Sequence, residues 1–524
     1  MATLPGSEAL TGEHPLTDAI GADGRFHGVP GQGLRSRTAR GSLVHAAFLV
    51  LLNMMNLARG LALAGFLTTA DYGLWGLIMI AFGSVGALAQ VGIDDKYIQQ
   101  DEPDQRTAFE LAFTLQCMLM GAFAVMIVIG MPLFALLYGH KEMLAPGLTL
   151  ALATPAYALQ VPLWVHYRRM DFVRQRLIQV VDPVVSLALT IGLAVTGFGV
   201  WAPVVGVVAG AWAMALVAVR TSPYRLRFRY ERASLRDYAS FSWPLFAAAL
   251  SYIVLAQTPA VVADKTLGLA AVGAITLGTS IAVFAHRLDG MITDALYPAI
   301  CSVKERRDVL FEAFSKSNRL ALLWAMPCGV GLALFAGDFV EFVIGEQWRL
   351  AVNLIAIFGL TAAIAEVAFN WTAFMRALGH TRAIAVAVFV QLVAVLAIAI
   401  PLLVAEGLTA FAIGNAIAVV LAVCVRLRYL SRLFALREML TPLWRPVVPA
   451  VTAGAVILML RTAGPVGRGP VRAVGEVALF ALLSAALSVV TERRLLKESV
   501  GYLRRRSDVA GEGAPLPLAT GLAK

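Results

Sequence analysis

The sequence predicts an all-α polytopic membrane protein with about 14 transmembrane helices. Three observations predict it: the composition, the recurrence of long apolar runs, and the placement of basic residues between those runs. Of the 524 residues, 59% are hydrophobic and 15% are charged, and the mean hydropathy is +0.76. Soluble domains average about 45–50% apolar and about 25% charged residues, so a single water-soluble core cannot bury this chain.

The apolar runs are long enough to cross a bilayer. A hydrocarbon core about 30 Å thick needs roughly 20 apolar residues at about 1.5 Å per residue. We expect helices near residues 42–64, 73–93, 108–130, 144–166, 177–196, 200–220, 240–261, 270–297, 318–340, 351–374, 383–404, 408–427, 444–461 and 473–491.

The basic residues predict the orientation. If both termini are cytoplasmic and the helices alternate, six of the 43 Lys and Arg residues fall in loops on the far side. Nearly all others fall in cytoplasmic segments, which is the bias expected of a bacterial inner-membrane protein. The net charge of +10 therefore indicates topology and not nucleic-acid binding. The six far-side residues are Lys141, Lys265, Arg349, Arg461, Arg468 and Arg472.

The order of apolar and basic segments along the chain predicts the domain organisation. Residues 1–40 are polar and lack an apolar run, so we expect a disordered cytoplasmic tail and no cleavable signal peptide. A six-helix lobe follows at 41–220, and residues 221–239 form a basic cytoplasmic loop between lobes. The remaining segments are a second six-helix lobe at 240–430, two extra transmembrane helices at 440–492 and a basic cytoplasmic tail at 493–524.

The two lobes share identical residues at an offset of 200 positions, which suggests an internal repeat. Gly73 and Leu77 match Gly273 and Leu277, and similar matches flank them. Because the first and seventh helices both begin inside, this offset predicts a parallel repeat with its axis along the membrane normal.

Arg287 is the most conspicuous ionisable residue in the expected membrane region. It lies about 15 Å deep in the eighth helix, where a charge costs roughly 2.5–3.5 kcal/mol. Asp294 shares its helix face, whereas Asp289 points elsewhere. Arg287 is a candidate substrate-binding residue and the aspartates are candidate ion-coupling residues. The alternative is a buried Arg–Asp pair that only joins helices.

A second polar stripe lies on the first helix, where Asn53, Asn56 and Arg59 follow one another on one side. We predict that these three residues bind substrate. Because only about five residues separate Arg59 from the outer interface, snorkelling of its side chain to the membrane surface is the alternative.

Two further acidic positions attract attention. Glu366 and Asn370, four apart on the tenth helix, are a candidate proton or cation site. Asp182, just before Pro183 in the fifth helix, is interpreted as an interfacial residue at a kink.

Signatures of soluble enzymes do not occur. The sequence holds no P-loop, GxSxG, HExxH or GxGxxG motif, and its four cysteines and seven histidines lack metal-ligand spacing. We therefore expect no enzymatic activity, no metal and no cofactor. Any energy that the protein needs must come from an ion gradient or from the gradient of its own substrate.

Four passages occur in a characteristic order. They are RGLALAGFLTTADYGLWGLIMIAFGSVGALAQVGIDDKYIQ at 59–99, YRRMDFVRQRLIQVVDPVVSLALTIGLAVTGFGVWAPVVG at 167–206, DKTLGLAAVGAITLGTSIAVFAHRLDGMITDALYPA at 264–299 and FMRALGHTRAI at 374–384. In these passages the chain resembles the polysaccharide (O-antigen type) flippases of the multidrug/oligosaccharidyl-lipid/polysaccharide transporter superfamily.

The resemblance implies two six-helix bundles around a central cavity, two extra C-terminal helices and alternating access. It also implies that the substrate is an undecaprenyl-pyrophosphate-linked oligosaccharide, moved from the cytoplasmic to the periplasmic leaflet during cell-surface polysaccharide biosynthesis. Arg59 and Arg287 would then receive the pyrophosphate, because the guanidinium group matches phosphate geometry. Membrane lipids, a polysaccharide polymerase and glycosyltransferases are the expected partners, and no nucleic acid is expected.

Three alternatives stay open. A multidrug or cation antiporter of the same superfamily shares the fold, but the cationic pair Arg59 and Arg287 argues against it. A lipid-II-type flippase would also need a cationic cavity. A membrane polysaccharide polymerase or ligase is less favoured, because such enzymes usually carry a long extracytoplasmic loop that this chain lacks.

Overall fold

The structure is a computed structural model that describes residues 48, 51–52, 54–88, 93, 97, 104–169, 171–231, 253–286, 289, 293, 300, 306–378, 380–463 and 469–498. All regular secondary structure in these residues is helical. Ten of the described helices are long and apolar enough to cross a membrane, and the number is eleven if one bent pair forms a single span. The chain is therefore a multi-pass helical membrane protein, as the composition predicts.

The first half of the chain supplies one group of helices. In chain order these are α2 (Thr69–Leu88), α4 (Gln105–Tyr138), η2 (Lys141–Met143), α5 (Leu144–Thr149), η3 (Leu150–Ala153), α6 (Thr154–Ala158), α7 (Pro162–Arg168), α8 (Phe172–Val195) and α9 (Trp201–Arg220). Residues 54–66 before α2 are also helical, and we call them the first helix.

The second half supplies the other group. Residues 253–267 are helical and are called the seventh helix. They are followed by α11 (Leu269–Ala282), η4 (Val283–His286), α13 (Arg307–Phe339), η5 (Val340–Ile344), η6 (Glu346–Ala351), α14 (Val352–Ala365), α15 (Trp371–Ala377), α16 (Thr381–Ala394), η7 (Val395–Ala399), α17 (Ile400–Glu406), α18 (Leu408–Leu430), α19 (Leu436–Leu440), η8 (Thr441–Leu443), α20 (Trp444–Ala463) and α21 (Pro470–Thr491).

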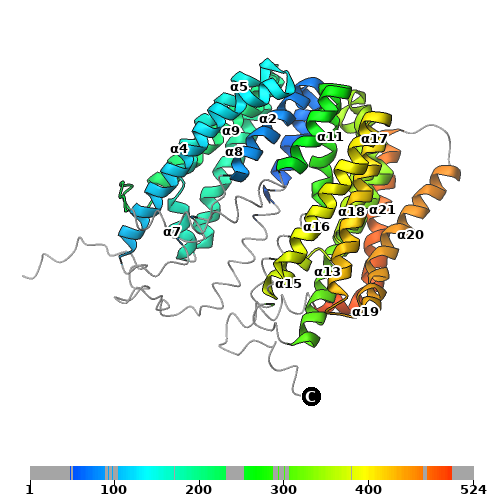
Figure 1. Ribbon diagram of the computed structural model, residues 1–524. Coiled ribbons are helices and arrows are strands. Elements are labelled where there is room, and N and C mark those ends of the chain that lie inside the picture. Colours follow the sequence, from blue (N-terminus) through cyan, green and yellow to red (C-terminus); the bar gives the residue numbers. More distant parts are fainter. Residues whose placement is uncertain are drawn as a thin grey trace, which may run out of the picture.

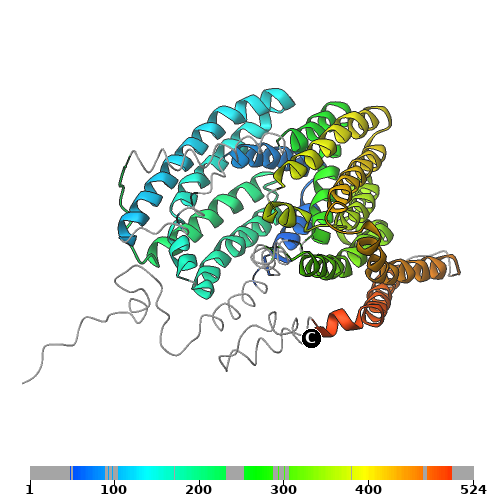
Figure 2. The same ribbon diagram turned by 60° about the horizontal axis from the view of Figure 1, so that its bottom comes forward.

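The two groups meet at one end and diverge toward the other (Figure 1). The helices α2, α5, α11 and α17 reach the end at which the groups meet, here called the joined end. The helices α7, α15 and α19 lie toward the opposite, diverging end. Turning the molecule shows that α20 and α21 lie on the flank of the second group, away from the first (Figure 2).

The joined end depends on a close helix crossing between α2 and α11. A Cβ atom on Gly73 would lie 2.0 Å from the carbonyl oxygen of Leu269, and one on Gly273 would lie 2.5 Å from that of Thr69. Neither distance is compatible with a side chain, so glycine permits the two backbones to touch. Leu77 is fully buried beside this crossing.

Two of the predicted helices are interrupted. The expected helix at 144–166 is a series of short segments containing Pro146, Pro155 and Pro162, and the part from Pro162 onward is bent by 46° relative to the part before it. Proline removes a backbone donor and crowds the preceding turn, which accounts for the bend. The expected helix at 351–374 ends at Ala365 and restarts as α15 at Trp371.

Two other helices are longer than predicted. The helix α4 has 34 residues where 108–130 was expected, and α13 has 33 where 318–340 was expected. The Asp104 side chain accepts a hydrogen bond from the Arg106 N–H and so caps the start of α4. At about 1.5 Å per residue α4 is about 50 Å long, which exceeds the hydrocarbon core of a bilayer.

Candidate functional site

A cavity of about 290 Å³ lies between the two groups of helices, near the glycine crossing. The first helix supplies Asn56 and Arg59 to its lining, α2 supplies Tyr72, and α11 supplies Ser280. Tyr72 and Ser280, from the two halves of the chain, both line this cavity. Polar groups from both halves of the chain therefore converge on one cavity.

Arg59 is a cationic residue that lines this cavity. Its Nη1 donates a hydrogen bond to Ser186 Oγ at 3.1 Å, and its charge interacts with the Asp182 carboxylate. Asp182 and Ser186 lie four residues apart on α8 and so share one helix face. The guanidinium therefore lines the cavity and interacts with a carboxylate and a hydroxyl of α8.

The joined end is closed by hydrogen bonds from the second half to the first helix. Trp348 Nε1 donates to the Ala64 carbonyl oxygen at 2.7 Å, and Gln347 Nε2 donates to the same oxygen at 3.2 Å. The Trp348 ring also packs edge-on against Tyr72, with centroids 5.0 Å apart. These contacts place a fully buried tryptophan directly beyond the cavity.

A second set of hydrogen bonds joins the seventh helix to the first group of helices. Gln257 Nε2 donates to Ser84 Oγ at 2.8 Å, and Gln257 Oε1 accepts a hydrogen bond from the Tyr138 hydroxyl. Just beyond the end of α4, His140 Nε2 lies 2.8 Å from Oδ1 of Asp264 in the seventh helix. Side chains from both halves therefore interlock along the joined end.

A separate polar cluster lies within the second half. Glu366 is buried, with 2% of its surface exposed, and its Oε1 lies 2.5 Å from His286 Nδ1. Arg426 and Asp289 both interact electrostatically with this carboxylate. Thr293 donates a hydrogen bond to Asp289 at 3.0 Å. The cluster thus combines two carboxylates, one imidazole and one guanidinium.

The interruption of the predicted 351–374 helix lies at this cluster. Ala368 has a φ of 59°, in the left-handed region that L-residues rarely adopt, and its N–H donates to Asn318 Oδ1 at 2.8 Å. Arg426 Nη1 donates to the Ala365 carbonyl oxygen at 3.2 Å, next to the break. Asn370 Nδ2 donates to Ser317 Oγ at 2.5 Å. Glu366 and Asn370 therefore flank a break and do not form one continuous helical face.

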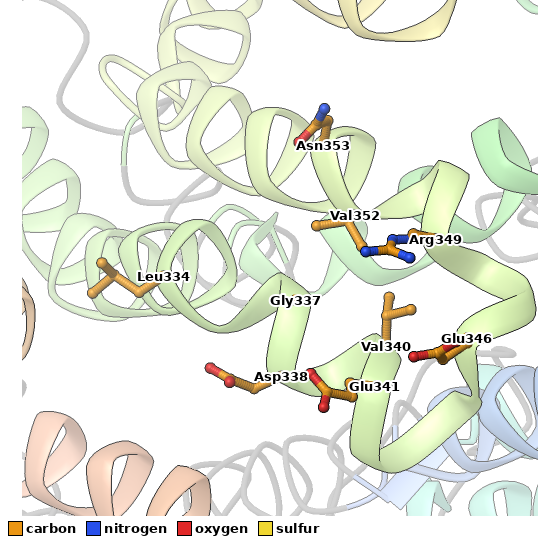
Figure 3. A pocket seen from close by; sticks show the side chains of 9 residues that line it. All are labelled: Leu334, Gly337, Asp338, Val340, Glu341, Glu346, Arg349, Val352 and Asn353. Atoms are coloured by element: carbon orange, nitrogen blue, oxygen red, sulfur yellow. The ribbon is translucent and has the colours of Figure 1, made fainter. Parts of the chain in front are cut away.

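A further cavity of about 420 Å³ lies at the joined end of the second half. Figure 3 shows Asp338, Glu341, Glu346, Arg349 and Asn353 around it. Asp338 accepts from Arg461 Nη2 at 3.1 Å, and Arg461 Nε donates to Glu476 at 2.9 Å. Arg461 thereby links α13 to α20 and α21, the two last helices of the described chain.

The predicted site residues divide into three sets. Asn56 and Arg59 share the cavity between the halves, whereas Asp289, Glu366 and Asn370 lie in or beside the buried cluster of the second half. Asn53, Arg287 and Asp294 lie outside the described residues, and the functional roles of all eight predicted site residues stay predictions.

Sequence reasoning missed four members of these sites. Asp182, interpreted as interfacial, contributes with Ser186 to holding Arg59, and their four-residue spacing on one helix was the available signal. His286 was treated as one of several scattered histidines. Arg426, near the end of the helix expected at 408–427, was not singled out from the sequence; it lies within α18, which continues to Leu430. Within the described residues, no group of His, Cys, Asp and Glu is arranged to hold a metal ion.

These features define a class: a multi-pass helical membrane transporter, with polar cavities between helices and a closure that joins its two halves. The model of the "Polysaccharide biosynthesis protein" family matches residues 62–353, more than half of the chain, so this protein belongs to that family. The polysaccharide flippase resemblance predicted from the sequence is confirmed.

Relatives point the same way. The chain is 20% identical over 462 residues to the succinoglycan biosynthesis transport protein ExoT of Rhizobium meliloti, covering 85% of this chain and 91% of that protein. It is 24% identical over 145 residues to the lipopolysaccharide biosynthesis protein WzxC of Escherichia coli, covering 27% of this chain and 30% of that one.

Solved structures show the same fold. A lipid II flippase, MurJ, in an inward closed conformation aligns with a TM-score of 0.66 at 12% identity, covering 87% of this chain and all of that one. An inward-facing multidrug resistance MATE family transporter aligns with a TM-score of 0.61 at 17% identity, covering 76% and 99% of the two chains. At these identities the likeness establishes the fold and not the substrate.

Proposed function

We propose that this protein flips an undecaprenyl-pyrophosphate-linked oligosaccharide from the cytoplasmic to the periplasmic leaflet, for cell-surface polysaccharide biosynthesis. The observation that carries the proposal is the placement of Arg59, a cation held inside a cavity between the two halves. A guanidinium in a low-dielectric site attracts an anion strongly, and its planar fork matches the oxygens of a pyrophosphate.

The substrate would exchange with the partners that Arg59 has in this state. Asp182 and Ser186 stabilise the guanidinium. An arriving pyrophosphate would take their place, and its release would restore the original contacts. Arg287, on the eighth helix, remains the predicted second cation for the same group.

The proposed architecture is fourteen transmembrane helices, with six-helix lobes at 41–220 and 240–430 and two added helices at 440–492. Both termini are cytoplasmic in a bacterial inner membrane. The joined end then faces the periplasm, because Arg168, Arg169, Arg220 and Arg307 end or begin helices at the opposite end. Alternating access requires that this joined end open while the diverging end closes.

The buried cluster is proposed as the coupling element. Glu366 contacts His286 and interacts with Arg426, at the break between α14 and α15. Protonation of a buried carboxylate changes which of these cations it holds, so a proton can shift the position of one helix segment relative to another. Asp289, Asn370 and the predicted Asp294 belong to the same proposed pathway.

The alternatives predict a different cavity chemistry. A multidrug or cation antiporter needs an apolar or acidic cavity, whereas the charged side chain among the described residues that line this cavity is an arginine. A lipid-II-type flippase shares the need for a cation and differs only in the sugar. A polysaccharide polymerase and glycosyltransferases are the proposed partners, since they would supply and consume the lipid-linked repeat.

Polymer export in cells tests the proposal. Cells that lack the gene and express Arg59→Ala should export no polymer although the variant reaches the membrane, and Arg59→Lys should restore part of the export because it keeps the charge. Arg437→Gln, which removes an exposed arginine from α19, is the control and should export normally. Full export by Arg59→Ala would overturn the proposal.

A further inference from the structure

An extended segment leaves the end of α9 and lies along the start of α4. We call residues 222–230 the basic strap. Its Tyr224 ring packs near Phe109 with centroids 5.5 Å apart, and its Phe228 ring packs near Phe113 at 5.3 Å. The strap is therefore attached to the first group of helices at two successive turns of α4.

Polar contacts also hold the strap in place. The Arg229 N–H donates to Thr114 Oγ1 at 2.7 Å, and its Nη1 donates to Thr107 Oγ1 at 2.8 Å. Near the other end, Arg169 Nη2 donates to the Tyr224 hydroxyl at 2.9 Å and its guanidinium lies over the ring. A connector that served only to span a distance would not need these contacts.

The exposed side chains of the basic strap include both cationic and aromatic residues. Arg225 and Arg227 are exposed, and no ion pair joins them to another residue in the part of the chain described. Phe228 is 75% exposed and Tyr230 is 63% exposed. The strap lies on the outer flank of α4, on the side facing away from the second group of helices (Figure 1).

The length of α4 places the strap at the membrane surface. This helix of 34 residues is about 50 Å long, which exceeds a hydrocarbon core about 30 Å thick. Its two charged residues, Arg106 and Glu110, both lie in the first turns, so these turns are the part that extends beyond the core. Those first turns, around Thr107 to Thr114, are the ones that the strap covers. Headgroup level is where exposed aromatic rings are stabilised and where basic side chains meet lipid phosphates.

We infer that the basic strap binds anionic phospholipid headgroups of the leaflet at the diverging end. Arg225 and Arg227 contact the phosphates, while Phe228 and Tyr230 anchor the segment among the headgroups. Charge complementarity and the lipid-facing flank favour this occupant. The inference does not rest on the transported substrate, so its failure would leave the proposed function intact.

Lipid titration followed by native mass spectrometry tests the inference. The intact protein should bind phosphatidylglycerol more tightly than phosphatidylcholine with the same chains. Each basic residue at a membrane surface is worth about fivefold in affinity, so Arg225→Gln/Arg227→Gln should weaken phosphatidylglycerol binding roughly 25-fold and leave phosphatidylcholine unchanged. Arg493→Gln/Arg494→Gln, which removes two exposed arginines beyond α21, is the charge-matched control and should keep the preference.

A cross-linking arm locates the lipid without removing any charge. A photoactivatable phenylalanine at position 230, in place of Tyr230, should form lipid adducts in membranes, and most should contain phosphatidylglycerol. Equal phosphatidylglycerol affinity in the strap variant and the control, or adducts made with a protein instead of a lipid, would overturn the inference.

Discussion

Gly73 and Gly273 lie against each other where α2 crosses α11. Each glycine contacts the backbone of the other helix at the residue four positions before the other glycine. The Cβ position of Gly73 falls on the carbonyl of Leu269, and that of Gly273 falls on the carbonyl of Thr69. Thr69 and Leu269 are themselves separated by the repeat offset of 200 residues. The crossing therefore has approximate twofold symmetry, which supports the parallel repeat expected from the sequence.

Gly73→Ala should push the two halves apart. The added Cβ would lie 2.0 Å from a backbone oxygen, and backbone cannot move aside as a side chain can. We expect the midpoint of thermal unfolding in detergent to fall by several degrees. Gly83→Ala on the same helix is the control, because no atom lies within 4 Å of its added Cβ. Alanine favours helix by about 1 kcal/mol over glycine, so the control should be neutral or stabilising. Equal midpoints in the two variants would contradict the packing.

Trp348→Phe should loosen the joined end. It keeps an aromatic ring but loses the hydrogen bond from Nε1 to the Ala64 carbonyl, worth about 1 kcal/mol. The population in which the joined end is open should therefore rise about fivefold. Spin labels on exposed positions of the two halves, Leu136→Cys on α4 and Val404→Cys on α17 in a cysteine-free background, would measure this as a longer distance.

The control for that experiment removes a similar bond within one half. Trp212 Nε1 donates to the Leu152 carbonyl at 2.9 Å, and both residues belong to the first half. Trp212→Phe should leave the label distances unchanged. If both tryptophan variants, or neither of them, lengthened the distance, Trp348 would not be part of the closure.

Arg461→Met should destabilise the protein because two buried carboxylates, Asp338 and Glu476, lose the cation that they share, although Glu476 keeps its contact with Arg472 at 3.0 Å. Asp338 and Glu476 are each 7% exposed, and both accept hydrogen bonds from this guanidinium. Breaking a buried charge pair on one side costs about 3–5 kcal/mol, whereas removing both sides costs much less. The triple variant Arg461→Met/Asp338→Asn/Glu476→Gln should therefore recover most of the lost unfolding temperature. A triple variant no more stable than the single one would argue against this network.

Glu366→Gln should abolish coupling to a proton gradient without abolishing substrate binding. The amide cannot ionise, so its interactions with His286 and Arg426 no longer depend on proton supply. In proteoliposomes, imposing a pH gradient should accelerate flipping by the native protein and leave this variant unaffected. Glu341→Gln, which changes a carboxylate of the separate 420 Å³ cavity, should respond as the native protein does. An undiminished response in Glu366→Gln would remove this residue from the coupling pathway.

The sequence correctly predicted a multi-pass helical membrane protein, because long apolar runs are what allow a chain to cross lipid. It did not predict the break at 366–370, because the N–H of Ala368 is satisfied by Asn318 from another helix. Nor did it predict that Asp182 would lie near Arg59, since only tertiary packing brings α8 beside the first helix. Polar residues were found readily as candidates, whereas their pairing depended on contacts between distant segments.

Binding of the lipid-linked anion to purified protein tests the central claim most directly. The titrant is an undecaprenyl-pyrophosphate-linked oligosaccharide, and undecaprenol without the pyrophosphate is the reference ligand. Native protein should bind the pyrophosphate ligand far more tightly than undecaprenol. Charge-assisted hydrogen bonds contribute about 1.5–3 kcal/mol, so Arg59→Gln should lose roughly tenfold to a hundredfold in affinity, while Arg59→Lys loses less and Arg437→Gln loses nothing. If Arg59→Gln bound the pyrophosphate ligand as tightly as the native protein, Arg59 would not be the anion site and the account would fail.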